Sequence, residues 1–465
     1  MCSTQEEHSS GNTNKQSQMD TRNNMTAFWE EHSKDGTVEE MMLDSRAKEL
    51  TQHELPEILS LLPCLTGSRV LELGAGIGRY TSPLLTLAGH VTAVDFMESF
   101  VERNRQDNGH HSNATFLQAD VTKLDMPKNS IDFIFSNWLL MYLTDEELQS
   151  FAEKMMGWLR PGGLLFFRES CNHRSGDFKR DFNPTCYRTE AQYNHLVTSM
   201  EMDVQEGGQK FGFDIVLKKK VQTYVQIKNN QNQICWLLEK VPRSPGTQNG
   251  FNTFQQFLDN QQYSNRNILR YEKMFGAGYV STGGPSTTKE FVDLLNLKPG
   301  QKVLDVGCGI GGGDFYMAKN FGVEVLGLDL SDNMVDTAIE RAVTEKLPSV
   351  QFEVADATKR SFPDASFDVI YSRDTILHID DKLTLFKRFH FIQEAGFCNV
   401  RSEDRTAQFM QVIKTELQRA ELIRDEFMQE FSEEDYLAIV KGWREKLERS
   451  NSGDQRWGLF YATKD

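Results

Sequence analysis

Glycines and acidic residues stand near one another in the first half of the chain at a spacing that suits binding of a cationic nucleoside. LELGAGIG places Glu72 two positions before Gly74, and Asp95 and Asp120 end two later segments. Glycine after a strand lets the backbone approach a ligand. Asp95 can accept bonds from ribose hydroxyls, and Asp120 suits an adenine amino group. Because Glu72 would repel a pyrophosphate but not a cationic methionine moiety, the pattern favours S-adenosylmethionine over a dinucleotide.

The same pattern recurs in the second half. Gly307 in LDVGCGIG, Asp329 and Asp356 follow Gly74, Asp95 and Asp120 at offsets of 233, 234 and 236 residues. Order, spacing and residue types all repeat, so the chain contains two similar domains joined head to tail.

Short apolar runs such as RVLEL, HVTAV and DFIFS alternate with helical segments in each copy. This alternation predicts parallel strands with crossover helices. We therefore expect an α/β fold of two tandem class I (Rossmann-like) S-adenosylmethionine-dependent methyltransferase domains. The expected boundaries are a disordered tail over 1–24, domains over 25–241 and 251–465, and a linker over 242–250.

Composition narrows the possible partners and compartments. The 465 residues carry a formal net charge of -16, which disfavours nucleic acid and anionic membrane surfaces. No apolar run has the length of a membrane span, and the polar N-terminus does not read as a secretory signal. The seven cysteines are scattered, which indicates reduced thiols and no metal site. We expect a cytoplasmic monomer that binds small molecules.

Long strings in both copies resemble the phosphoethanolamine N-methyltransferases of plants, nematodes and protozoa, above all the two-domain plant type. They include EEHSKDGTVEEMMLDSRA, IFSNWLLMYL and FFRESC in the first domain, and NQNQICWLLEKV, YVSTGG, YSRDTILHI and QRWGLF further on. The resemblance runs from about Met25 to the C-terminus. It implies three methylations of phosphoethanolamine to phosphocholine, the first in the first domain and the later two in the second. Two alternatives are a methyltransferase for another small amine and a non-catalytic second domain.

The resemblance also implies site residues in the first domain. The cofactor contacts would be Gly74, Arg79, Asp95, Asp120, Val121 and Asn137, and the phosphobase pocket would comprise Ser170, Ser175, Gly176, Arg180 and Tyr187. Without the resemblance, 170–187 is a polar loop in which Arg180 could meet a phosphate or simply be solvated. Tyr142 lies on an apolar run, where a tyrosine is usually a core residue whose hydroxyl has a hydrogen-bond partner.

In the second domain the implied cofactor contacts are Val280, Ser281, Gly307, Asp329, Asp356, Ala357 and Arg373, and the implied phosphobase contacts are Gln262, Tyr263, Tyr271 and Lys446. Tyr263 and His378 match a Tyr–His pair that assists proton removal, and Asp374 lies beside them in the catalytic group. Read alone, His378 on an apolar segment also fits a structural role.

The second domain departs from the family after DTILHIDDKLTLFKRFH. In the first domain a WLRPGG turn and the strand LLFF follow this position, whereas here the chain continues into FIQEAGFCNV. We interpret this as an internal deletion near residues 389–391, which an alternatively spliced product or an imperfect gene model would explain. Loss of an inner parallel strand predicts a destabilised second domain that lacks most phosphate donors.

Overall fold

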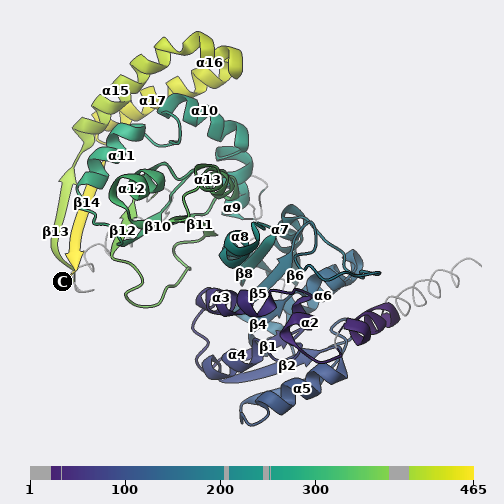
Figure 1. Cartoon of the computed structure of the whole chain (residues 1–465). Coiled ribbons are helices and arrows are strands. Elements are labelled where there is room, and N and C mark those ends of the chain that lie inside the picture. The colour runs from purple at the N-terminus through teal and green to yellow at the C-terminus, as the bar shows by residue number, and fades with distance from the viewer. Residues whose placement is uncertain are drawn as a thin grey trace, which may run out of the picture. The chain divides into compact units, whose positions relative to one another are not determined.

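The computed structural model describes residues 22–32, 34–203, 209–243, 251, 253–375 and 397–464. The chain divides into two compact units: the first comprises Met1–Thr253 and Lys359–Ser361, and the second comprises Phe254–Thr358 and Phe362–Asp465 (Figure 1). Within the described ranges, no helix is both long and apolar enough to cross a membrane.

The first unit contains one mainly parallel sheet covered by helices. Its strands have the order β3-β2-β1-β4-β5-β8-β7, with β6 beside β7. The strands β3 to β5 run parallel, and β8 and β7 are antiparallel to their neighbours. The elements after a helical stretch over residues 22–32 are α2 (Val38–Met42), α3 (Ala47–Ser60), β1 (Arg69–Leu73), α4 (Thr81–Leu87), β2 (His90–Asp95), α5 (Glu98–Asn108), β3 (Ala114–Gln118), β4 (Ile131–Asn137), η1 (Leu140–Tyr142), α6 (Asp145–Trp158), β5 (Leu159–Ser170), α7 (Glu190–Ser199), β6 (Glu201–Asp203), β7 (Lys210–Lys220), α8 (Gln222–Lys228) and β8 (Gln233–Arg243).

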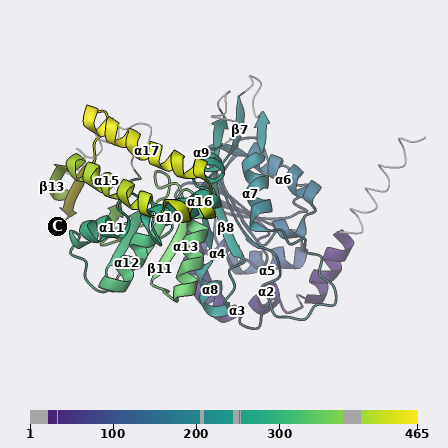
Figure 2. The ribbon, with the colours of Figure 1, turned by 90° about the horizontal axis from the view of Figure 1, so that it is seen from above.

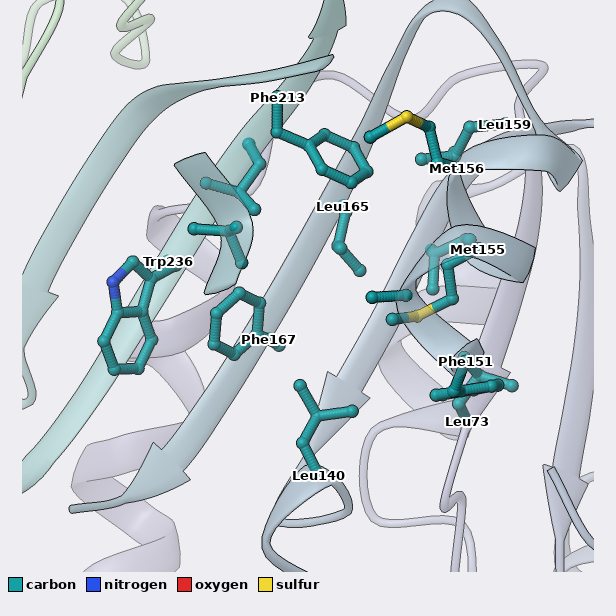
Figure 3. Close-up of a cluster of buried hydrophobic side chains, with 14 of the residues drawn as sticks. Leu73, Leu140, Phe151, Met155, Met156, Leu159, Leu165, Phe167, Phe213 and Trp236 are labelled. Carbon is teal, nitrogen blue, oxygen red and sulfur yellow. The ribbon is translucent and has the colours of Figure 1, made fainter. Parts of the chain in front are cut away.

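Strand β5 joins the parallel and antiparallel halves of this sheet. It pairs in parallel with β4 and antiparallel with β8, so hydrogen bonds satisfy both of its edges. Figure 3 shows Leu165 and Phe167 of β5 among Phe213 of β7, Trp236 of β8 and Leu73 of β1. The rings of Phe167 and Trp236 stack with centroids 4.7 Å apart. Strand β5 therefore lies at the centre of an extensive hydrophobic cluster.

Parallel register brings three strand ends to one edge. Leu73 of β1 pairs with Val94 of β2 and with Ser136 of β4, so Asp95 and Asn137 end their strands beside the end of β1. The glycine-rich loop follows, and Gly74 N donates to Val94 O at 2.9 Å. Polar groups from β1, β2 and β4 thus converge at the carboxyl edge of the sheet, where ligands bind in such folds.

The second unit repeats the parallel half of this arrangement. Strands β11, β10, β9 and β12 are parallel neighbours in that order, and β13 and β14 form a separate antiparallel pair. The elements are α9 (Phe254–Phe257), η3 (Leu258–Gln262), α10 (Asn265–Phe275), α11 (Gly284–Asp293), β9 (Lys302–Val306), α12 (Gly312–Phe321), β10 (Glu324–Asp329), α13 (Asp332–Glu345), β11 (Val350–Ala355), β12 (Val369–Ser372), β13 (Phe397–Asp404), α15 (Thr406–Leu422), α16 (Arg424–Glu430), α17 (Glu433–Ser452) and β14 (Gly458–Lys464). Helices α15 and α17 lie side by side over a second apolar cluster that includes Phe275 of α10 (Figure 2).

The two units differ at the edge of the fourth parallel strand. In the first unit β5 lies against β4, whereas β12 of the second unit pairs only with β9 among the strands that the structure describes. The antiparallel pair β13–β14 forms a sheet of its own. The predicted deletion near 389–391 lies outside the described residues.

Two expected boundaries were wrong. Residues 22–24, assigned to a disordered tail, are helical, because the helix over 22–32 buries Met25 and Phe28 and Arg22 pairs with Glu147. Pro242 and Arg243, assigned to the linker that begins at 242, end strand β8. The strand extends this far because Arg243 pairs with Asp214 of β7 at 2.7 Å.

Candidate active site

A cavity at the carboxyl edge of the first unit brings together two groups of predicted residues. Its lining includes Gly74, Arg79, Asp95, Asp120, Val121 and Asn137 from the predicted cofactor contacts, and Ser170, Ser175, Arg180 and Tyr187 from the predicted phosphobase pocket. A methyl donor and an acceptor could therefore occupy the same enclosed space.

Each of the two carboxylate oxygens of Asp95 accepts one backbone hydrogen bond. Its Oδ2 accepts from Gly76 N at 2.8 Å, and its Oδ1 accepts from Met97 N at 2.9 Å. Burial raises the pKa of Asp95 to about 6, although these backbone hydrogen bonds oppose the rise. Each oxygen keeps a lone pair for a further donor, which suits a pair of ribose hydroxyls.

Glu72 and Asp120 line the same cavity as Asp95. Thr81 Oγ1 donates to Glu72 at 2.5 Å, and burial raises the pKa of Glu72 to about 8. A bound cation would favour its ionised form. Oδ1 of Asp120 accepts from Thr122 N at 3.0 Å, while Oδ2 faces Arg22 Nε at 3.4 Å. These acids, with the apolar lining from Phe96, Met97, Phe100 and Val121, fit the cationic, ribose and adenine parts of S-adenosylmethionine.

The helix over residues 22–32 forms one wall of this cavity. Met25 and Trp29 line it, and the Trp29 ring makes edge contacts with Phe100 and Tyr142 at centroid distances of 5.9 and 5.8 Å. Arg22 fixes the start of the helix through its pairs with Asp120 and Glu147. Arg22 falls within the stretch expected to be a disordered tail, and no role was predicted for Trp29.

The loop after β5 is fastened to the segment after α2. Both oxygens of Asp177 accept from Ser45, from its backbone N at 2.8 Å and its Oγ at 2.6 Å. A Cβ at Gly176 would lie 2.3 Å from Leu43 O. Gly176, predicted to contact the phosphobase, is outside the cavity lining and instead permits this close backbone approach.

Arg180 reaches the cavity without an acidic partner. Within the described part of the chain, no carboxylate lies within ion-pair distance of its guanidinium, and its buried Nε makes no hydrogen bond. Tyr142 and Tyr187 line the cavity beside it, and burial raises the pKa of Tyr142 while the charge of Arg180 opposes that rise. A half-buried cation that lacks a counter-ion is suited to bind an anion such as a phosphate.

Two side chains behind the cavity were not predicted. Glu54 of α3 and Arg168 of β5 are fully buried and form an ion pair. Glu54 recurs with Leu50 and Ile58 at every fourth position of α3 on its buried face. An acid among apolar residues at this spacing, and an arginine inside the apolar run LLFFRES, were the available signals.

The second unit repeats the geometry of the donor acid. Asp329 Oδ2 accepts from Gly309 N at 3.0 Å, and Oδ1 accepts from Ser331 N at 2.9 Å. Burial raises the pKa of Asp329 as it does that of Asp95. Thr358 N donates to Asp356 at 2.9 Å, as Thr122 does to Asp120, but Ala357 is exposed where Val121 is buried.

Several predicted phosphobase residues of the second unit lie near one another. Tyr263 Oη accepts from Gln262 Nε2 at 3.0 Å. Burial raises the pKa of Tyr263, and the charges of Asp329 and Asp374 and the nearby Tyr271 act in the same direction. Burial lowers the pKa of Lys446, which the charge of Asp374 opposes.

Other predicted residues of the second unit serve local contacts. Arg373 donates to Thr282 O at 2.5 Å and to Thr287 Oγ1 at 2.6 Å, and Asp374 accepts from Trp457 Nε1 at 3.0 Å. Val280 packs beside the glycine loop, and Ser281 O accepts from Gly284 N. His378 lies outside the described residues, so its pairing with Tyr263 stays a prediction. A cavity between α10, α12 and α13 includes none of the predicted site residues.

Comparison with known proteins identifies two copies of one domain in this chain and assigns the chain to a specific family. A family described as "Methyltransferase domain" matches residues 70–163 and again 303–396. Phosphoethanolamine N-methyltransferase 3 of Arabidopsis thaliana is 51% identical over 484 residues, covering 94% of this chain and 97% of its own length. Phosphoethanolamine N-methyltransferase of Triticum aestivum is 51% identical over 483 residues, covering 94% of each chain.

A solved structure extends the likeness. Haemonchus contortus phosphoethanolamine N-methyltransferase 1, in complex with phosphoethanolamine and S-adenosylhomocysteine, matches with a TM-score of 0.59 and 26% identity, covering 86% of this chain and 94% of its own. The alignment with the Arabidopsis relative, at 484 residues, is longer than the 465 residues of this chain. That relative therefore has residues without a counterpart here.

Proposed function

Because this chain belongs to the phosphoethanolamine N-methyltransferases, which use S-adenosylmethionine, we propose that its first unit performs the first methylation and that its second unit contributes little to the later ones. The proposal for the first unit rests on the lining of a single cavity. Arg180, a cation without a carboxylate partner among the described residues, lines the same cavity as Asp95, an acid with two free lone pairs.

Arg180 would bind the phosphate of the acceptor. A dianionic phosphate needs charge-assisted donors, and a guanidinium offers two parallel N–H groups for this purpose. Ser170 and Tyr187, in the same lining, add hydroxyl donors. Ethanolamine without the phosphate would leave Arg180 unpaired, which makes the phosphate the main determinant of acceptor choice.

Trp29 and Tyr142 would hold the amine end. Their rings meet at an interplanar angle of 60° and both line the cavity, so they can contact an ammonium group through their π faces. Burial raises the pKa of Tyr142, so its hydroxyl stays protonated at neutral pH and can accept a hydrogen bond from the ammonium. When bound, S-adenosylmethionine supplies the methyl group from its sulfonium. The amine must lose a proton before it attacks, which makes the reaction faster at higher pH until the enzyme itself is affected.

The second unit retains donor-site geometry, but its described residues include no strand in the position of β5 to support an acceptor site. Asp329 and the glycine loop match the first unit, whereas β12 has no described neighbour in the position of β5. In the first unit β5 ends at Ser170 and leads into the loop that carries Arg180. A dianion that is poorly paired in a buried site costs several kcal/mol, and each 1.4 kcal/mol reduces the rate about tenfold. We also propose that the chain acts as a cytoplasmic monomer. The six described cysteines form no disulfide, which supports a reducing compartment.

Product analysis tests this division of labour. The full chain is incubated with labelled S-adenosylmethionine and, separately, with phosphoethanolamine and its monomethyl and dimethyl derivatives. We expect phosphomonomethylethanolamine to accumulate from phosphoethanolamine, with little phosphocholine from any substrate. Asp95→Asn should suppress the first methylation, while Asp107→Asn, which changes an exposed acid of α5, serves as the matched control.

A gain-of-function variant completes the test. Insertion of the segment that the Arabidopsis relative has and this chain lacks, after Phe389, should restore conversion of phosphomonomethylethanolamine to phosphocholine. If the chain as it stands makes phosphocholine efficiently, the proposal for the second unit is wrong. If methylation of phosphoethanolamine does not depend on Asp95, the proposal for the first unit is wrong.

A further inference from the structure

A buried cluster of charges lies directly behind the cavity of the first unit. Oε1 of Glu54 accepts from Arg79 Nη1 at 3.2 Å, from Tyr80 Oη at 2.8 Å and from Arg168. The side chains of Glu54 and Arg168 are both 0% exposed. Two cations therefore share one anion, which leaves a net positive charge beside the cavity.

The cluster touches the cavity only through intermediaries. Arg79, Tyr80, Asn137 and Trp138 line the cavity, whereas Glu54 and Arg168 do not. Arg168 Nη1 donates to Asn137 Oδ1 at 3.2 Å, and its guanidinium lies 3.9 Å from the centroid of the Trp138 ring. The buried Glu54–Arg168 ion pair thus contacts side chains that face the cavity and restricts their orientation.

Stability alone does not account for this arrangement. A buried ion pair is seldom more stabilising than apolar side chains of similar volume, because both ions lose hydration. Here the pair is also incompletely satisfied: Oε2 of Glu54 and Nε and Nη2 of Arg168 make no hydrogen bond within the described protein. Burial opposes ionisation of Glu54, but Arg168 and Arg79 outweigh it and hold the pKa of Glu54 below its usual value.

The second unit provides an internal comparison. By the 233-residue offset of the repeat, Thr287 stands in the position of Glu54 and Gly312 in that of Arg79. The acid and its cation are therefore replaced together. Arg373, in the position of Asn137, is bound by Thr282 O and Thr287 Oγ1 instead. The first unit has both the acid Glu54 and the cation Arg79, and the second unit has neither at these positions. This supports a role for Glu54 in holding Arg79.

We propose that Glu54 and Arg168 are positioning residues of the first unit, which hold Arg79 and Asn137 against the cavity so that Arg79 presents its charge to the carboxylate of the methyl donor. This inference rests on the donor site proposed for the first unit. Arg79 has its Nη1 engaged by Glu54, and its guanidinium lies 4.6 Å from the Tyr80 ring centroid and 5.5 Å from that of Trp138. Such restraint lowers the entropy lost when an arginine binds a carboxylate.

The test separates positioning from stability by using single and paired substitutions in the full chain. Glu54→Gln leaves the buried Arg168 and the partly buried Arg79 without an anion and should lower both the melting temperature and donor affinity. Glu54→Gln combined with Arg168→Met removes the charges together and should recover much of the melting temperature. Donor affinity should stay reduced by about tenfold or more in the paired variant, because Arg79 and Asn137 have lost their partners.

Binding is measured by calorimetry with S-adenosylhomocysteine in an Asp329→Asn background, which weakens the donor site of the second unit. The KM for S-adenosylmethionine should rise in parallel, while the KM for phosphoethanolamine changes by less than about threefold. Glu57→Gln is the matched control: Glu57 lies on the same helix and binds Thr223 Oγ1 at 2.7 Å, away from the cavity. It should lower the melting temperature and leave donor affinity unchanged.

Two further variants keep the outcome decisive. Arg168→Lys retains the charge beside Glu54 but removes the planar guanidinium that lies 3.9 Å from the centroid of the Trp138 ring and places Nη1 between Glu54 and Asn137. It should therefore lose part of the donor affinity, and it provides a test even if the other variants fail to fold. A paired variant or Arg168→Lys with normal donor affinity would overturn the inference. Asp95→Asn is the reference variant: if it too leaves donor affinity unchanged, the proposed donor site itself is wrong, whereas a loss confined to Asp95→Asn refutes only the positioning role.

Discussion

Asp95→Asn should weaken binding of the methyl donor to the first unit while preserving side-chain shape. Each carboxylate oxygen of Asp95 already accepts one backbone N–H, from Gly76 at 2.8 Å and from Met97 at 2.9 Å. Asparagine replaces one of these oxygens with an NH2 group. One backbone N–H then faces a donor instead of an acceptor, and one oxygen no longer accepts from a ribose hydroxyl.

The expected magnitude follows from the number of bonds lost. One hydrogen bond to a charged acceptor contributes about 1.5–3 kcal/mol, and the misplaced NH2 weakens the unliganded protein as well, which cancels part of the difference. A net loss of about 1–3 kcal/mol raises the dissociation constant by about 5- to 150-fold. Asp329→Asn should have a matching effect on the second unit, because its two backbone contacts measure 3.0 and 2.9 Å.

Asp95→Asn should also change the pH dependence of donor binding. Burial raises the pKa of Asp95 to about 6, so the side chain is ionised above that pH and neutral below it. The ionised form accepts from both ribose hydroxyls, so donor affinity should be full above about pH 6 and decline as the pH falls through this value. Asparagine cannot titrate, so Asp95→Asn should remove this part of the pH dependence.

Calorimetric titration with S-adenosylhomocysteine, at several values between about pH 5 and pH 8, measures both effects. The full chain should show two classes of site, and Asp95→Asn should weaken one of them. Unchanged affinity for both classes, or an equal loss in the exposed control Asp107→Asn, would refute the assignment of Asp95. A pH dependence that persists in Asp95→Asn would assign the titration to another group.

Three further substitutions probe the acceptor end and the walls of the cavity. Arg180→Ala should raise the KM for phosphoethanolamine by about 100-fold, as expected for a truncated charge pair, and change the KM for the donor far less; equal turnover of free ethanolamine would contradict the phosphate assignment. Gly176→Ala should lower the free energy of unfolding by about 1–3 kcal/mol, because its Cβ would lie 2.3 Å from Leu43 O. In the same melting experiment the control Gly442→Ala, at a position on α17 with open space for a Cβ, should raise the free energy of unfolding by about 0.5–1 kcal/mol. Arg22→Ala removes two partly buried ion pairs, worth about 1 kcal/mol, and should speed release of S-adenosylhomocysteine about fivefold in stopped flow; an unchanged release rate would show that the helix over 22–32 does not retain the donor.

Repetition made most of the fold predictable from sequence. The offset between Gly74 and Gly307, and between Asp95 and Asp329, identified two copies of one strand and helix pattern, and the structure places both acids at equivalent strand ends. The same physical rule, that parallel strands gather their carboxyl ends at one edge, predicted that the acids and the glycine loop would meet. Arg180 and its loop came from resemblance, because a polar loop alone does not specify where its arginine points.

What sequence missed depends on contacts between distant segments. Glu54 and Arg168 are 114 positions apart, and only the packing of α3 against β5 brings them together. Arg22 was assigned to the disordered tail because that prediction uses only the local composition. Its partner Glu147 lies far away in the sequence, on α6. Pro242 begins a stretch whose Pro, Ser and Gly content suggested a linker, yet the end of a strand tolerates a proline.

The position of β5 also sets how cooperatively each unit unfolds. In the first unit β5 joins both halves of the sheet, so its amides should exchange with solvent only through global unfolding and should be among the slowest in hydrogen exchange. In the second unit β13 and β14 form a sheet of two strands, and such a ribbon is marginally stable unless other elements hold it. Its amides should open at a lower free energy than those of β9 and β10. The chain would therefore carry one unit that unfolds as a whole and one that opens in stages.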